Sequence, residues 1–160
     1  MPTSAGLLMY RVRDGQLEVL LVHPGGPFFA NKDDGVWTIP KGMPDDPAEE
    51  LLACARREFR EETGLDPGAG PFLPLGSVKQ KGGKTVHAWA FEGDCDAAQI
   101  VSNTFRVQWP PRSGKWITVP EVDRAAWFVA PDAVKKINAA QAEFVARLRS
   151  AVSLRSDSGA

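Results

Sequence analysis

Apolar runs separated by turn residues predict strands along most of the chain. An antiparallel hairpin is predicted over residues 5–23, because Asp14 and Gly15 between its two apolar runs are suited to positive φ. A second hairpin is predicted over residues 78–91, around a Gly-Gly pair. Further short strands are expected at residues 36–39, 104–109, 116–119 and 127–129.

One helix is predicted in the middle of the chain, over residues 47–63. Its start carries an N-cap carboxylate at Asp46, a proline at Pro47 in the first helical position, and an acidic residue, Glu49, three after the cap. Gly64 is expected to supply a left-handed residue at the C-terminal end of this helix, which is a structural role. A strand pattern that surrounds a helix indicates a layered α/β or α+β fold.

The C-terminal part of the chain is predicted to be helical from residue 131. Asn138 and Gln141 have the spacing of an N-cap and its reciprocal partner. We expect a disordered tail at residues 153–160. A length of 160 residues and an ordinary globular composition then indicate one domain over residues 1–152.

The charge balance limits the partners to be expected. Nineteen Lys and Arg residues against twenty Asp and Glu residues give a net charge of −1, so the chain lacks the broad basic field of non-specific nucleic-acid binding. Nucleic acid is therefore not an expected partner, and any site for a polyanion must be local. No apolar run approaches the ~20 residues of a membrane span, and no secretory leader is visible, so we expect no membrane partner and a cytoplasmic protein.

Three carboxylates in the predicted helix form the main candidate site. At ~100° per residue, Glu58, Glu61 and Glu62 fall within about one third of the helix circumference. Their mutual repulsion indicates a compensating cation, and hard oxygen ligands suit Mg²⁺ or Mn²⁺. The alternative is a solvated helix whose glutamates are balanced by arginines such as Arg57 and Arg60.

The wider pattern resembles the Nudix hydrolase family, whose signature is Gly, five residues, Glu, seven residues, then Arg-Glu-apolar-x-Glu-Glu-x-Gly-apolar. Glu49 lies eight residues before Arg57, and residues 57–65 match the second half of the signature at every specified position. The first half departs at one point, because six residues rather than five separate Gly42 from Glu49. A loop absorbs such an insertion at little entropic cost.

The resemblance implies an α/β/α sandwich with a mixed β-sheet, and hydrolysis of a nucleoside diphosphate linked to another group, X. It also implies that Glu58, Glu61, Glu62 and the backbone carbonyl of Gly42 bind the divalent metal. Glu49 is expected to be structural, either holding the arginine of the motif or closing the helix cap; neither role makes it a metal ligand.

The identity of the residue that accepts the proton from the attacking water stays open. The resemblance places Arg57, Glu61 and Glu62 in the catalytic group, and either glutamate is a candidate acceptor. Family members also recruit a base from a distal loop, for which Glu121 and Glu92 are candidates.

Candidate substrate contacts are cationic or aromatic. Lys41 directly precedes Gly42, and Lys79 and Lys81 share one face of the predicted second hairpin, where they form a candidate polyphosphate clamp. Lysines on such a hairpin also keep an edge strand soluble, and His87 is as well explained as a structural residue. Trp109, before a Pro-rich loop, is a candidate for stacking on a base.

Three functions remain to be compared. A dinucleoside polyphosphate or a nucleoside triphosphate is the favoured substrate of a metal-dependent pyrophosphohydrolase. The alternatives are a non-catalytic nucleotide-binding regulator with the same fold and an enzyme that removes pyrophosphate from the 5′ end of RNA.

Overall fold

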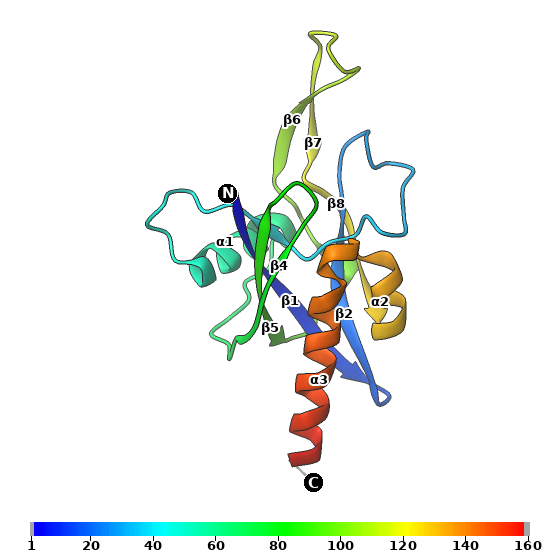
Figure 1. Ribbon diagram of the computed structural model, residues 1–160. Coiled ribbons are helices and arrows are strands. Elements are labelled where there is room, and N and C mark those ends of the chain that lie inside the picture. Colours follow the sequence, from blue (N-terminus) through cyan, green and yellow to red (C-terminus); the bar gives the residue numbers. More distant parts are fainter. Residues whose placement is uncertain (1, 159–160) are drawn as a thin grey trace.

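The computed structural model describes residues 2–158, which fold around a six-stranded mixed sheet (Figure 1). The strand order is β4-β5-β1-β2-β8, and β3 pairs with β1 beside this path. β1 and β5 run parallel, whereas the other pairs are antiparallel. The strands are β1 (Thr3–Arg13), β2 (Gln16–Pro24), β3 (Lys41–Gly42), β4 (Leu73–Lys79), β5 (Thr85–Glu92) and β8 (Val122–Val129).

Both predicted hairpins are confirmed. β1 and β2 pair antiparallel around Asp14 and Gly15, whose φ angles of 51° and 77° are the positive values that the sequence predicted. β4 and β5 pair antiparallel around Gly82 and Gly83, and β4 begins earlier than expected, at Leu73. β8 also begins earlier, at residue 122 rather than 127.

Helices cover both faces of the sheet, as expected for an α/β/α sandwich. α1 (Leu51–Thr63) packs the apolar residues of its buried face, which include Phe59, against alternate residues of β1 such as Leu7. α2 (Ala130–Lys136) and α3 (Ala142–Ser158) cover the opposite face, where Phe144 and Leu8 belong to the same cluster. The period of two along β1 thus divides its side chains between the two cores.

The start of α1 differs from the prediction, because the helix begins at Leu51 and not at residue 47. The Asp46 carboxylate accepts a hydrogen bond from the Ala48 amide (2.7 Å) in a local turn. The side chain of Glu49 accepts from the Asp45 amide (2.9 Å) and does not close a capping box on Asp46. Both carboxylates therefore accept hydrogen bonds in the turn that precedes the helix. The helix begins about four residues later than the predicted cap.

The C-terminal end of α1 agrees with the sequence. Gly64 has a φ of 75°, and its amide donates to the Arg60 carbonyl (2.8 Å).

The prediction of a strand at residues 36–39 is wrong. These residues form only isolated bridges, one of which joins Thr38 to Val22. Lys41 and Gly42, where a turn was expected, instead form β3 against the N-terminal half of β1. The Ile39 amide is occupied by the side chain of Gln141 (3.0 Å), so a continuous ladder cannot extend through it.

That contact also corrects the cap predicted before the last helix. Asn138 caps as expected, since its side chain accepts from the Ala140 amide (3.0 Å), but Gln141 reaches across to residues 38 and 39 rather than back to Asn138. α3 continues to Ser158, into the segment where a disordered tail was expected, and residues 159 and 160 of that tail lie outside the described residues. None of the helices in the described part of the chain is long and apolar enough to cross a membrane.

The strands β6 (Thr104–Gln108) and β7 (Trp116–Pro120) form a separate two-stranded sheet. Figure 1 shows this hairpin projecting from the body, at the top of the view. We call residues 104–120 the arm.

Candidate active site

Two glutamates of the motif are buried on the same side of α1. Glu58 and Glu62 lie one helical turn apart and are 8% and 5% exposed, respectively. The adjoining face of the helix packs Cys54, Ala55 and Phe59 into the core against β1. This packing fixes the depth at which the two carboxylates are held.

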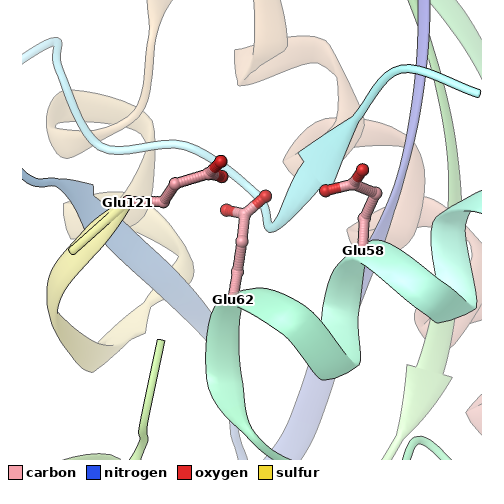
Figure 2. Close-up of side chains that lie close together, drawn as sticks. All are labelled: Glu58, Glu62 and Glu121. Carbon is pink, nitrogen blue, oxygen red and sulfur yellow. The ribbon is translucent and has the colours of Figure 1, made fainter. Parts of the chain in front are cut away.

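Glu121 joins these two glutamates from a distant part of the chain. It lies between β7 and β8, and each of the three residues offers a carboxylate oxygen within 4.8 Å of the others. Figure 2 shows the Glu62 and Glu121 carboxylates pointing toward one another, with Glu58 on the same side of α1. We call Glu58, Glu62 and Glu121 the carboxylate cluster.

Asn103 holds Glu121 against α1. Its backbone amide donates to the Glu61 carbonyl (2.7 Å), and its carbonyl accepts from the Glu121 amide (2.9 Å). The Asn103 side chain also lies close enough to the Glu121 carboxyl to counteract part of the rise in its pKa. The last turn of the helix and the loop before β8 are therefore joined through a single residue.

Burial and like charge disfavour the ionised form of the carboxylate cluster, and the charges of Arg57 and Lys41 offset this only in part. Burial raises the pKa of Glu62 well above its ordinary value, with contributions from Glu121 and Glu58. Burial and then the charge of Glu61 raise the pKa of both Glu58 and Glu121. A divalent ion with a preference for oxygen ligands would remove this repulsion, so the residues present fit Mg²⁺ or Mn²⁺.

Gly42 brings β3 against the carboxylate cluster. A Cβ atom at this position would collide with the carboxylate group of Glu58, so the Glu58 side chain can keep its present position only beside a glycine. The Gly42 carbonyl accepts a weak hydrogen bond from the Cys54 thiol (3.5 Å). The six residues before Glu49 lie in a loop that is mostly exposed, which takes up the extra residue without displacing Gly42 from Glu58.

Arg57 is held at the edge of the site by Glu49. Its Nε and Nη2 donate to the two Glu49 oxygens at 2.9 and 3.0 Å, and this pairing lowers the pKa of Glu49 to about 2. Nη1 donates to Glu58 (3.0 Å) and to both oxygens of Glu61 (3.2 Å). The Glu61 carboxylate is thus turned toward Arg57, beside the carboxylate cluster.

A cavity of about 340 Å³ opens beside the carboxylate cluster. Glu62, Glu121 and Lys41 line it together with apolar groups that include Phe29 and Phe105. The Lys41 amide donates to Glu62 (3.2 Å), and the side chain of Lys84 contacts that of Lys41. Burial, followed by the Lys84 charge, lowers the pKa of Lys41.

The other predicted substrate contacts are less closely placed. His87 is partly buried and pairs with Ala5 of β1, which also pairs with Gly42 of β3. The His87 side chain therefore lies on the face of the sheet that α1 covers. Lys79 and Lys81 are exposed near the β4–β5 turn. Trp109 lies on the arm, where its ring and that of Phe28 pack nearly perpendicular to each other (5.1 Å between centroids).

The structure does not bring Glu92 to the carboxylate cluster. Glu92 lies five residues beyond His87 on β5, so the two residues are about 16 Å apart along the strand. Two other residues were missed by sequence reasoning. Asn103 and Phe105 lie far from the motif along the chain, and no local pattern marks either as part of the site. The two cysteines, Cys54 and Cys95, are free thiols.

Comparison with known proteins gives a clear result. Residues 2–148 match the model of the NUDIX domain. Among solved structures, a C. elegans Ap4A hydrolase in a binary complex has a TM-score of 0.67 and 23% identity, covering 96% of this chain and 98% of that one.

Two bacterial structures are also similar in fold. The NUDIX domain of Shewanella oneidensis NrtR, complexed with ADP ribose, has a TM-score of 0.63 and 18% identity over 95% of this chain and 88% of that one. The Nudix hydrolase RenU from M. smegmatis has a TM-score of 0.61 and 20% identity over 96% and 86%.

Proposed function

We propose a substrate class and a mechanism for this chain from the premise that it belongs to the Nudix family and is a pyrophosphohydrolase. The substrate is a nucleoside diphosphate linked to a further group X, with a dinucleoside polyphosphate or a nucleoside triphosphate as the favoured members. Water attacks a phosphorus of the anhydride, a new P–O bond forms, and the bond from that phosphorus to the bridging oxygen breaks.

Glu58, Glu62 and the Gly42 carbonyl are the residues we assign to hold Mg²⁺ or Mn²⁺. The observation that carries this proposal is the convergence of three carboxylate oxygens, two from α1 and one from the residue between β7 and β8, within 4.8 Å. Glu61 remains a proposed member of the ligand set, since its charge acts on both Glu58 and Glu121. A bound ion would neutralise phosphate charge and lower the pKa of a coordinated water.

Glu121 is the residue we assign to accept the proton from the attacking water. It lines the cavity beside Glu62, and the hydrogen bond from its amide to the Asn103 carbonyl fixes its backbone there. Its raised pKa brings it closer to the working range of a general base. Arg57 acts as a positioning residue, because it ties Glu58 and Glu61 to Glu49.

The substrate phosphates are proposed to lie against Lys41. This lysine shares the cavity with Glu62 and Glu121, so an anion bound there is adjacent to the carboxylate cluster. Lys79, Lys81 and His87 remain proposals for the outer phosphates, because the same hairpin brings Lys84 to Lys41. Trp109 remains a proposed base contact.

A hydrolysis screen tests the proposal. It covers nucleoside triphosphates, oxidised nucleotides, dinucleoside polyphosphates, nucleotide sugars and ADP-ribose, with Mg²⁺, Mn²⁺ or a chelator, and identifies the products. We expect Glu62→Gln to lower kcat/KM by about a hundredfold or more while the far-UV circular dichroism is unchanged. The matched control is Glu50→Gln, an exposed glutamate that makes no cap hydrogen bond. Parental activity in Glu62→Gln contradicts the assignment.

The same preparations separate the two roles open to Glu121. Titration calorimetry with Mn²⁺ measures metal affinity directly. If Glu121 accepts the proton, Glu121→Gln keeps the metal affinity and loses turnover. Loss of metal affinity equal to that of Glu62→Gln would instead make Glu121 a ligand.

A further inference from the structure

His23, at the end of β2, is a fully buried polar side chain that lies outside the motif. Its Nδ1 lies 2.8 Å from a carboxylate oxygen of Asp123, and its Nε2 lies 2.7 Å from the Lys32 carbonyl oxygen. A carbonyl only accepts, so Nε2 carries a proton, and a second hydrogen bond joins Nδ1 to Asp123. One buried ring therefore joins two segments that lie far apart in the chain.

Asp123 is an extra residue in the pairing of β8 with β2. His23 pairs with Arg124, and Pro24 pairs with Val122, so no residue of β2 lies opposite Asp123. In a regular strand the residue next to Arg124 would point away from His23. A bulge turns the extra side chain, and this is how Asp123 reaches the histidine ring.

The bulge also sets which residue reaches the carboxylate cluster. With Asp123 accommodated as an extra residue, the Gly25 amide donates to the Glu121 carbonyl (2.8 Å). If the strands paired without a bulge, each residue before Asp123 would move along β2 by one position, and Val122 would take the place of Glu121. A shift of one residue turns every side chain to the other face, so Glu121 would leave the carboxylate cluster.

The second hydrogen bond of His23 holds the loop that follows β2. The Lys32 carbonyl accepts from Nε2, and the Lys32 amide donates to the Phe29 carbonyl (3.0 Å), so both backbone groups of Lys32 are engaged. Phe29 lines the cavity together with Glu62 and Glu121. His23 thus supports both the wall of the cavity and the segment that carries Glu121.

We propose that His23 is a positioning residue of the active site. It holds Asp123 in the bulge and so keeps Glu121 at the carboxylate cluster. Through Lys32 it also holds the loop that places Phe29 at the cavity. The effect on turnover rests on the proposed function, in which Glu121 accepts the proton from the attacking water.

Asp123→Ala is the first test, because Asp123 is partly exposed and its loss should leave the chain folded. We expect kcat to fall about tenfold or more, since a displacement of about 1 Å at a reacting group costs up to about 100-fold. KM and the calorimetric affinity for Mn²⁺ should change less than about twofold, because Glu58 and Glu62 stay in place. Asp123→Asn should restore most of kcat, since its side chain still offers the His23 ring a hydrogen bond.

A double-mutant comparison separates positioning from a general loss of stability. His23→Phe keeps an aromatic ring beside Trp37 and loses both hydrogen bonds. It should lower kcat as Asp123→Ala does and also raise KM, because the loop that carries Phe29 is released. In the Glu121→Gln background, each of these variants should lower the remaining kcat by less than about twofold, because the group that they position is absent.

The matched control is Asn138→Ala, which removes a side-chain cap before the last helix, outside the site. It should lower the urea midpoint and leave kcat and KM at parental values. An equal fall of kcat in Asn138→Ala and Asp123→Ala would overturn the proposal, because stability alone would then explain it. Parental kcat in Asp123→Ala, no recovery in Asp123→Asn, or full losses in the Glu121→Gln background would also overturn it.

Crystal structures of the parent and of Asp123→Ala test the placement without turnover. We expect the Glu121 carboxylate to lie away from Glu62 in the variant, and an unchanged Glu121 would show that the proposal is wrong. If the parent shows no metal-dependent hydrolysis but Glu121 is displaced in Asp123→Ala, the positioning holds and the proposed function fails. Turnover that Glu62→Gln abolishes and Asp123→Ala leaves at the parental rate gives the opposite result.

Discussion

The carboxylate cluster and the arm are held in place by different means. Glu58 and Glu62 of the cluster are buried and Glu121 is partly buried, and the three are held by core packing of α1, by the close approach of Gly42 and by the Asn103 bridge. The arm is exposed, and its strands pair only with each other. Like charges held close together repel one another, so the carboxylate cluster needs rigid support. The arm contains no such cluster and does not need it. Substitutions should therefore affect stability at the cluster and leave it nearly unchanged at the arm.

The largest effect is expected at Gly42. A methyl group in Gly42→Ala would meet the Glu58 carboxylate, so the variant must displace either β3 or Glu58. We expect the free energy of unfolding to fall by about 1 kcal/mol, at the low end of overpacking costs, because the colliding carboxylate can move. Hydrolysis should fall further than stability explains, because Glu58 leaves the cluster. Urea unfolding and the hydrolysis assay measure the two effects.

The matched control is Gly93→Ala, which lies outside the site and does not have a positive φ. Its new methyl group would lie 3.4 Å from the nearest Met9 and Phe91 carbons, at the edge of ordinary contact. We expect a change below about 0.5 kcal/mol and parental activity. Equal losses in the two variants would mean that the Gly42 approach has no special role.

A smaller effect, with a defined pH dependence, is expected at Glu49. Arg57 lowers the pKa of Glu49 to about 2 from an ordinary value of 4.5. A carboxyl whose pKa is lower in the folded state adds stability above the ordinary pKa and loses it as the pH falls through the folded value. The stability difference between the parent and Glu49→Gln should thus be complete at pH 7 and shrink between about pH 4.5 and 2.

Urea midpoints at pH 7, 5, 3 and 2 measure this difference. Glu50→Gln is the control, because Glu50 is exposed and should show no such pH dependence. A difference between the parent and Glu49→Gln that stays constant down to pH 2 would contradict the pairing with Arg57.

The smallest effect is expected at the arm. Trp116 is half exposed and contacts Arg106 across its own ribbon, so Trp116→Ala removes little buried area. We expect the free energy of unfolding to change by less than about 0.5 kcal/mol, measured by urea titration. A loss comparable to that of Gly42→Ala would show that the arm is part of the cooperative core and that the arm and the carboxylate cluster do not differ in this respect.

Much of the site on α1 could be predicted because it depends on residues close together in the chain. The spacing of Glu58 and Glu62 places them on one face of any helix, and Gly64 ends that helix for a local conformational reason. The helix start was misplaced because Glu49 had two possible partners. Asp46 is near in sequence, but Arg57 offers a bidentate ion pair across the first turns, and this contact prevails.

By itself, the sequence determined the two hairpins, the central helix and the glutamates that share its face, because turn geometry and helical periodicity act over a few residues. Only the tertiary structure decided that Glu121 completes the carboxylate cluster, that Asn103 holds it there, and that Phe105 links the cavity to the arm. These contacts join segments far apart in the chain. They depend on strand register and on packing across the sheet, and no short-range pattern contains that information.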